Sequence, residues 1–135
     1  MIKNNNQFVK KKNIEFFSQN IKYQKAVNSL DTYKILYEII TQYVKKTNRL
    51  LDIGHGGSFD YDTSQVNEIT GLDLDHMIDV KYIPKNMKLE IGSALEIPNN
   101  LINFDTVLLV MLIHHLIGND VNENLENLDK CISES

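Results

Sequence analysis

Hydrophobic residues recur first at a helical period and later in short, nearly continuous runs. The residues at helical spacing are Tyr33, Leu36, Tyr37, Ile40 and Val44. Their spacing of three and four predicts a helix capped by Ser29 or Asp31 and running to about Lys46. Tyr33 and Tyr37 both fall on the face expected to pack against a core.

Four apolar runs after this helix have the length of buried strands. They are RLLDI at 49–53, EITGLD at 68–73, KLEI at 88–91 and FDTVLLVM at 104–111. Runs of this kind, separated by loops or helices, predict parallel strands joined by crossovers. The fourth run is the most apolar, which is typical of a central strand covered on both faces. The fold class expected is therefore α/β, with a Rossmann-like, mostly parallel sheet and N-terminal helices.

The segments between the strands and after them carry weaker signals. The stretch from Phe59 to Asn67 is rich in Asp, Ser and Thr, and Pro84 interrupts the next connection, so both crossover helices should be short or absent. A capping box, Asp120-x-x-Glu123, begins a last helix. Its expected core face consists of Val121, Leu125, Leu128 and Ile132.

Length and composition indicate one domain. The chain has 135 residues, 42% of them hydrophobic, and we divide it into a basic helical segment at 1–28 and a core at 29–135. Its longest apolar run, residues 107–113, is far shorter than the roughly 20 residues of a membrane span. The N-terminus lacks the apolar stretch of a secretory signal, and Cys131 is the single cysteine. These features predict a reduced, cytoplasmic protein.

Charge is distributed unevenly and argues against a nucleic-acid partner. Residues 1–25 hold six lysines against Glu15, a net of +5, whereas residues 26–135 have a net of −9. The acidic body would repel a phosphate backbone. Arg49 is the single arginine, so bidentate recognition of phosphate or guanine is poorly supplied. We read the lysine run at 10–12 as a solvated helix face, with contact to an anionic substrate as the alternative.

The ends of the first two predicted strands carry candidate binding residues. Parallel sheets bind ligands beyond the carboxyl ends of their strands. Strand one runs from Asp52 into the glycine-rich turn Gly54-His55-Gly56-Gly57, where a ligand can approach the backbone closely. An acid so near the turn disfavours a pyrophosphate and suits an ammonium group. Asp73, at the end of strand two, can accept hydrogen bonds from both hydroxyls of a ribose. Taken alone, each could also be an ordinary turn residue.

The ends of strands three and four complete the set. Gly92-Ser93-Ala94 follows the third run, and Met111 leads into His114-His115 after the fourth. Histidine is the natural proton acceptor near neutral pH, so His114 and His115 are the candidate catalytic bases; structural packing is the alternative for each. No metal site is expected, because the adjacent pair cannot easily present both rings to one ion.

As a set, these motifs resemble class I S-adenosylmethionine-dependent methyltransferases. LLDIGHGGSFD looks like motif I of that family and ITGLDLD like motif II, while EIGSALEIP and NFDTVLLVMLIHHL are similar to the segments of strands three and four. The resemblance covers about residues 49–132 in the family's order. It implies S-adenosylmethionine as cofactor, S-adenosylhomocysteine as product, and methyl transfer to a small-molecule oxygen or amine acceptor, a sugar or another metabolite.

The resemblance also implies roles for individual residues. Gly54 and Gly56 would lie under the methionine part of the cofactor, with Asp52 near its amino group, and His55 would contact its carboxylate or stand as an exposed turn residue. Asp73 would hold the ribose hydroxyls. The remaining contacts would come from Leu74 packing on the adenine, Ser93 and Ala94 at its edge, and Met111 beside the sulfonium.

Two departures from the family pattern matter. The family often has an aspartate where Ser93 stands, and its sheet continues with three more strands after the helix that ends this chain. Strand four would then be an edge with exposed apolar faces. We therefore expect a further part of the protein, or self-association, to cover it.

Three other functions compete with methyl transfer to a small molecule. A non-catalytic module that binds S-adenosylmethionine or S-adenosylhomocysteine would keep the same motifs. A nicotinamide-dependent dehydrogenase shares the turn and the second acid, but Phe59 stands where its fingerprint needs Gly or Ala. Methylation of RNA or protein is the last; the acidic body and the absence of an Asn-Pro-Pro-Tyr type motif after strand four disfavour it.

Overall fold

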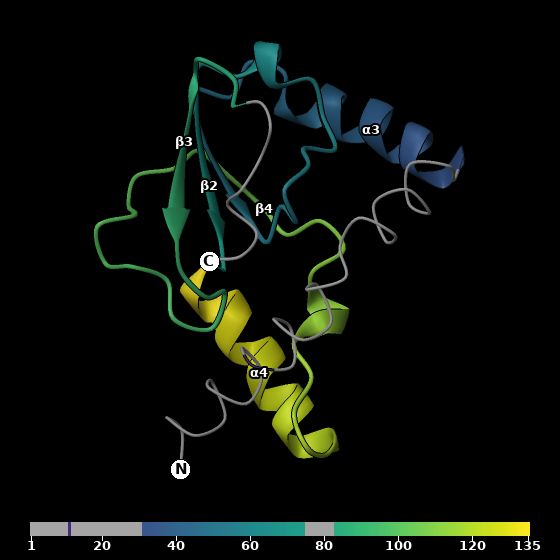
Figure 1. Cartoon of the computed structure of the whole chain (residues 1–135), viewed down its shortest axis with the longest axis vertical. Helices are drawn as coiled ribbons and strands as arrows, with labels where there is room; N and C mark the ends of the chain where they lie inside the picture. Colours follow the sequence, from purple (N-terminus) through teal and green to yellow (C-terminus); the bar gives the residue numbers. More distant parts are fainter. Residues whose placement is uncertain (1–10, 12–30, 75–82) are drawn as a thin grey trace.

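The protein is an α/β structure built on one parallel sheet. The computed structural model describes residue 11, residues 31–74 and residues 83–135; most of the predicted helical segment 1–28 lies outside them. The strands are β1 (Arg49–Ile53), β2 (Glu68–Asp73), β3 (Met87–Ile91) and β4 (Thr106–Leu108). They form a four-stranded sheet in the order β3-β2-β1-β4, with every pairing parallel (Figure 1). The predicted α/β fold with a Rossmann-like parallel sheet is confirmed.

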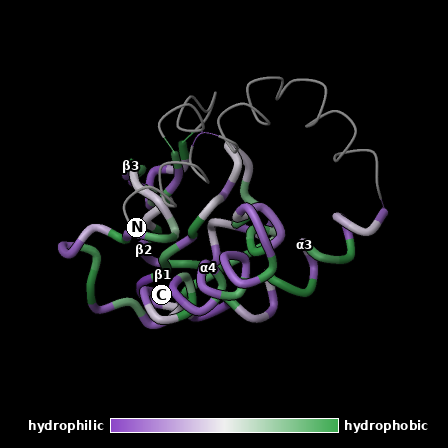
Figure 2. The backbone as a smooth tube through the Cα atoms, turned by 90° about the horizontal axis from the view of Figure 1, so that it is seen from below, coloured by the Kyte–Doolittle hydropathy of each residue, from purple (hydrophilic) through white to green (hydrophobic). Residues whose placement is uncertain are grey.

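Two helices supply side chains to two separate hydrophobic clusters. Helix α3 (Asp31–Val44) contributes Ile40 and Val44 to one, and α4 (Val121–Glu134) contributes Cys131 to the other. Both helices carry hydrophobic and hydrophilic segments along their turns (Figure 2). Within the part of the chain that the structure describes, neither helix is long and apolar enough to cross a bilayer.

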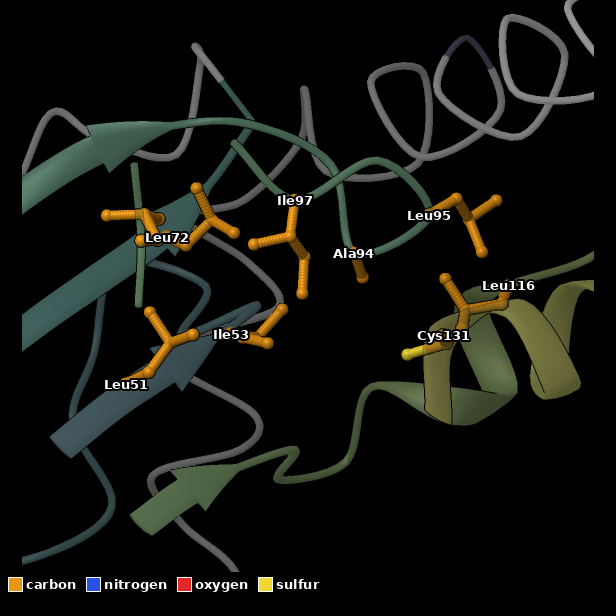
Figure 3. Packing of buried hydrophobic residues seen from close by; sticks show 9 residues of the cluster. Leu51, Ile53, Leu72, Ala94, Leu95, Ile97, Leu116 and Cys131 are labelled. Atoms are coloured by element: carbon orange, nitrogen blue, oxygen red, sulfur yellow. The ribbon is translucent and has the colours of Figure 1, made fainter. Parts of the chain in front are cut away.

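Alternation along the strands assigns the buried apolar side chains to one cluster or the other. Leu50 belongs to the α3 cluster and its neighbour Leu51 to the α4 cluster, because successive side chains of a strand point to opposite faces. Figure 3 shows the α4 cluster, in which strand residues meet the loop after β3 and the region of α4. Its labelled members are Leu51, Ile53, Leu72, Ala94, Leu95, Ile97, Leu116 and Cys131.

The connection between β1 and β2 agrees with the short crossover expected there. Between β1 and β2 the chain makes a single turn of 3-10 helix, η1 (Thr63–Gln65), whose start is capped by Asp62 accepting from the Ser64 N–H (3.0 Å). Between β3 and β4 it forms turns without a helix. Most of the connection between β2 and β3, residues 75–82, lies outside the described residues.

Strand β4 is shorter than the sequence indicates and is not central. Residues 104–111 were expected to be extended and covered on both faces, but only Thr106–Leu108 pair with β1, and they are half-buried at the edge of the sheet. The ladder ends because β1 itself stops at Ile53 and Gly54 turns away with a φ of 74°. Beyond that point β4 has no neighbour to pair with, and Met111 enters the left-handed region at a φ of 52°.

The prediction of which α4 residues are buried was wrong. Asp120 caps the helix as expected, accepting from the Glu123 N–H (3.0 Å). However, Val121, Leu125 and Ile132 are 71%, 58% and 59% exposed. The fully buried residues are instead Asn127 and Cys131, about a quarter of a turn or more away around the helix. Tyr37 of α3 is likewise exposed, although Tyr33 is half-buried.

Asn127 fastens α4 to the turn that precedes it, and this contact should be measurable. Its buried amide donates to the carbonyl of Leu116 (3.1 Å). We expect Asn127→Ala to lower the free energy of unfolding by about 1–3 kcal/mol, since the buried carbonyl loses this donor. Urea denaturation of the variant measures the loss. The exposed Asn122→Ala is the control, and an equal loss in both variants would contradict the assignment.

Candidate functional site

The glycine-rich segment after β1 forms a tight turn. The Ser58 N–H donates to the carbonyl of His55 (3.1 Å), which closes a four-residue turn. Its central residues, Gly56 and Gly57, have φ angles of 63° and 78°. Two successive positive φ values are the mark of a type I′ turn, and glycine adopts them without a steric penalty. The sequence therefore dictates this turn through its Gly-Gly pair.

Three consecutive N–H groups of the turn already have acceptors within the protein. The Gly56 N–H donates to Oδ2 of Asp73 (2.7 Å), the Gly57 N–H to Nδ1 of His55 (3.0 Å), and the Ser58 N–H to the His55 carbonyl. A glycine-rich loop that binds phosphate uses such groups as its donors. Here they are engaged, so the turn differs from a phosphate cradle.

Asp73 joins the ends of β1, β2 and β3. Its Oδ2 accepts from Gly56, its Oδ1 accepts from the N–H of Leu74 (2.7 Å), and its carbonyl accepts from the N–H of Gly92 after β3 (2.9 Å). The residue is buried, as is Leu74. A carboxylate offers about four acceptor positions, so two backbone bonds leave capacity for further donors.

Asp52 lies beside this turn as a buried acid. It is 3% exposed and accepts a hydrogen bond from the Tyr61 hydroxyl (2.9 Å). Burial raises the pKa of its carboxyl to about 7; the Tyr61 bond acts in the opposite direction, and the charges of Asp60 and Asp73 add to the rise. Asp52 therefore titrates near neutral pH, and a cation beside it would favour its ionised form.

His55 is buried, so the interpretation as an exposed turn residue was wrong. Its side chain is 0% exposed, and its ring centroid lies 5.1 Å from that of Phe59. The ring also lies against β2, because a Cβ added to Gly71 would approach its Cδ2 to 3.1 Å. Glycine at position 71 thus leaves the space that the imidazole occupies. Burial lowers the pKa of His55 although Asp73 opposes this, which favours the neutral ring.

After β3, the predicted residues form a small turn. The Oγ of Ser93 accepts from the Leu95 N–H (3.2 Å), and the Glu96 N–H donates to the Ser93 carbonyl (3.0 Å). Ala94 is buried in the α4 cluster, beside Ile97 (Figure 3). Through the bond from Gly92 to Asp73, this turn starts next to the end of β2.

After β4, the chain returns to the glycine turn through Leu112. A Cβ on Gly54 would lie 2.5 Å from a methyl group of Leu112, so the two residues are in close contact. Met111, one residue earlier, is 52% exposed. Two features therefore favour glycine at position 54: its φ of 74° and the close approach of Leu112.

His114 and His115 lie in the 3-10 helix η3 (Ile113–His115) with ring centroids 3.9 Å apart. His114 is exposed and His115 is half-buried. Burial, with a smaller contribution from His114, lowers the pKa of His115 to about 4. A base with so low a pKa accepts a proton weakly at neutral pH, so His114 is the better candidate for a proton acceptor.

The predicted positions at the four strand ends meet at one edge of the sheet. Asp73 bonds to the glycine turn and to Gly92, and Leu112 contacts Gly54. The arrangement brings together the glycine turn, the buried carboxylate of Asp73 and the start of the turn after β3, with Leu112 against Gly54. Among residues 31–74 and 83–135, no three acidic, histidine or cysteine side chains gather as metal ligands.

The sequence analysis missed two residues of this site. Tyr61 holds Asp52, and Leu112 covers Gly54. The signal for a buried His55 was available, since an isolated glycine within a strand, here Gly71, often marks a close approach of another group. No comparable local signal identifies Tyr61 or Leu112, because each reaches its partner through the tertiary fold.

Comparison with known proteins gives no assignment. No protein-family model matches the chain. No curated protein matches it either. Its function is therefore inferred from the site.

Proposed function

We propose that this protein binds S-adenosylmethionine at the glycine turn and transfers its methyl group to a small-molecule acceptor. The observation that carries the proposal is the way the turn uses its donors. The N–H groups of Gly56, Gly57 and Ser58 are bonded within the protein, and two of their three acceptors belong to His55. The turn therefore suits a ligand that supplies donors or positive charge.

The charges around the turn support a cationic ligand. Asp52 and Asp73 are buried beside it, and Asp60 is half-buried in the same segment. A buried carboxylate with one hydrogen-bond donor is costly to ionise unless a positive charge lies near. The ammonium and sulfonium groups of S-adenosylmethionine are two such charges. The remaining acceptor positions of Asp73 suit the two ribose hydroxyls.

The same features disfavour a nicotinamide dinucleotide. Its pyrophosphate needs free N–H groups at the turn and the start of a helix after it. In this protein the donors of the turn are engaged, and the segment after it contains only the three-residue η1. Two acids, Asp60 and Asp62, add negative charge where the pyrophosphate would bind.

For the transfer step we assign His114 as the proton acceptor and His115 as its neighbour. Methyl transfer is an in-line displacement that depends mainly on placing the acceptor close to the methyl carbon. An acceptor hydroxyl or protonated amine also loses a proton, and the exposed His114 can take it. The acidic body favours a small molecule over a nucleic acid, and the single, buried thiol of Cys131 suits the reducing cytoplasm.

Calorimetric titration of the chain with S-adenosylhomocysteine tests the proposal. We expect binding, and we expect Asp73→Ala to weaken it about 10- to 100-fold, because each hydrogen bond to a charged group contributes about 1.5–3 kcal/mol. The matched control is Glu96→Gln, which removes an exposed acid from the turn after β3. It should bind as the wild type does.

Two results would count against the proposal. Binding that survives Asp73→Ala unchanged would remove Asp73 from the site. Enhancement of NADH fluorescence by the wild-type chain, without binding of S-adenosylhomocysteine, would replace the cofactor by a dinucleotide. The second candidate function is cofactor binding without turnover. It would be supported by binding together with no methyl transfer in the presence of acceptors.

A further inference from the structure

His55 has a hydrogen-bonding arrangement that exists only in one protonation state. Its Nδ1 accepts from the Gly57 N–H (3.0 Å), so this nitrogen carries no proton. The proton of the neutral ring is therefore on Nε2. Among the described residues, Nε2 is buried and has no hydrogen-bond partner. The ring is thus fixed by a bond that a second proton would remove.

Asp73 offers the alternative partner. Its Oδ2 lies 4.0 Å from Nδ1 of His55 and also accepts the Gly56 N–H (2.7 Å). If Nδ1 gains a proton, the Gly57 N–H loses its acceptor and a charged N–H faces a carboxylate. A small shift of the ring would form a charge-assisted bond to Oδ2, in competition with Gly56. Protonation of His55 would therefore affect two of the three hydrogen bonds that hold the turn, those donated by Gly56 and Gly57.

Asp73 is the charged neighbour that opposes the effect of burial on the pKa of His55, and the other groups near the ring come from β3, β1 and its own segment. From β3, Leu89 is apolar, and it approaches the same space over Gly71 as the imidazole. On its own segment, Phe59 covers the ring. Asp52 of β1 is bonded to Tyr61, and Asp60 follows Phe59; both add negative potential to this region. The ion pairs of Lys34, Arg49 and Lys88 are formed with other residues.

We propose that His55 and Asp73 form a proton-operated latch on the glycine turn: neutral His55 holds the turn through Gly57, and protonated His55 releases Gly57 and binds Asp73. The exchange takes up one proton from solvent at Nδ1. Apart from that N–H bond, only these hydrogen bonds change. The control of cofactor affinity by the latch rests on the proposed function. The exchange of hydrogen bonds at His55 does not depend on it.

The direction of the pH dependence follows from burial. Burial disfavours the charged ring, so the pKa of His55 is below its ordinary value and the latch opens in acid. If the cofactor binds only the closed turn, its affinity falls about tenfold for each unit of pH below that pKa. Asp52 also titrates, near pH 7, but it is unchanged in His55→Asn, so a pH dependence that is lost in that variant belongs to His55.

NMR of the full wild-type chain, with S-adenosylhomocysteine titrations on the same sample, tests the latch. Expected are a neutral His55 with its proton on Nε2 at pH 7.5, and a Gly57 amide shift at the pH where His55 becomes charged. Affinity should fall with the same midpoint. His55→Asn retains an acceptor for Gly57 without a titrating group, so its affinity should lose this pH dependence, whereas His114→Asn should keep it.

The outcomes separate the latch from the cofactor. A His55 that stays neutral until the protein unfolds, or a Gly57 amide that does not respond to its charge, would overturn the latch. An exchange at His55 in a protein that binds no S-adenosylhomocysteine at any pH would keep the latch and overturn the proposed function. Binding whose affinity does not follow the His55 midpoint would keep the function and overturn control by the latch.

Discussion

Replacement of Gly54 by alanine should destabilise the protein more than any other single methyl group added to the site. The residue has a φ of 74°, which costs a side chain about 1–3 kcal/mol. The new Cβ would also lie 2.5 Å from a methyl group of Leu112, and overpacking adds about 1–3 kcal/mol. Since small domains are stable by only about 5–15 kcal/mol, the variant should unfold at much lower urea concentration.

A second substitution separates the two causes. Leu112→Ala removes the side chain that the new Cβ would meet. In the Gly54→Ala, Leu112→Ala double variant, the loss in free energy of unfolding should be smaller than the sum of the two single losses. The effect of Gly54→Ala that persists when residue 112 is already alanine reflects the φ angle. Additive losses would show that Leu112 does not press on Gly54.

Removing the charge of Asp52 should stabilise the protein in alkali and not in acid. The pKa of Asp52 is raised from 3.8 to about 7 in the folded protein. The unfolded chain therefore releases this proton first, and stability is lost as the pH rises from about 4 to 7. At pH 8 the penalty is complete, so Asp52→Asn should be more stable than the wild type by roughly 1–3 kcal/mol, with no gain near pH 4.

The partner of Asp52 supplies the control. Burial raises the pKa of Tyr61, so this residue remains a donor throughout the range. Tyr61→Phe leaves the carboxylate without the donor that stabilises its charge, and it should lower stability more at pH 8 than at pH 5. In the Asp52→Asn, Tyr61→Phe double variant this difference should disappear. Denaturant unfolding at pH 5 and pH 8 measures the difference for Tyr61→Phe. For Asp52→Asn the comparison is between pH 4 and pH 8, and equal effects at these two values would refute a buried charge.

The sheet was predictable because its signals are local. The bounds predicted for β1 and β2 agree with the structure, and β3 differs by one residue. The length of β4 was not predictable, because it depends on where β1 ends and not on its own apolar run. The buried face of α4 was also wrong, since Asn127 is selected by a carbonyl eleven residues away, that of Leu116, and hydrophobicity alone points to Val121 and Leu125.

The site was predictable as a set of positions and not as a set of contacts. The rule that ligands bind beyond the strand ends places Gly54, Asp73, Ser93 and Met111 at one edge. In the structure, hydrogen bonds join the glycine turn, Asp73 and Gly92 there. The partners of these residues come from the fold. Nothing in the sequence around Asp73 shows that it accepts the Gly56 N–H, because that bond depends on the parallel register of β1 and β2.

The bonds that close the glycine turn have a consequence for the speed and entropy of association. The turn is held in one shape by Asp73 and His55 before anything binds to it. A ligand then meets a backbone that is already ordered, and the entropy of arranging it was lost when the chain folded. We therefore expect encounters at this edge of the sheet to resemble docking onto a rigid surface, with a rate set by diffusion and charge more than by rearrangement of the turn.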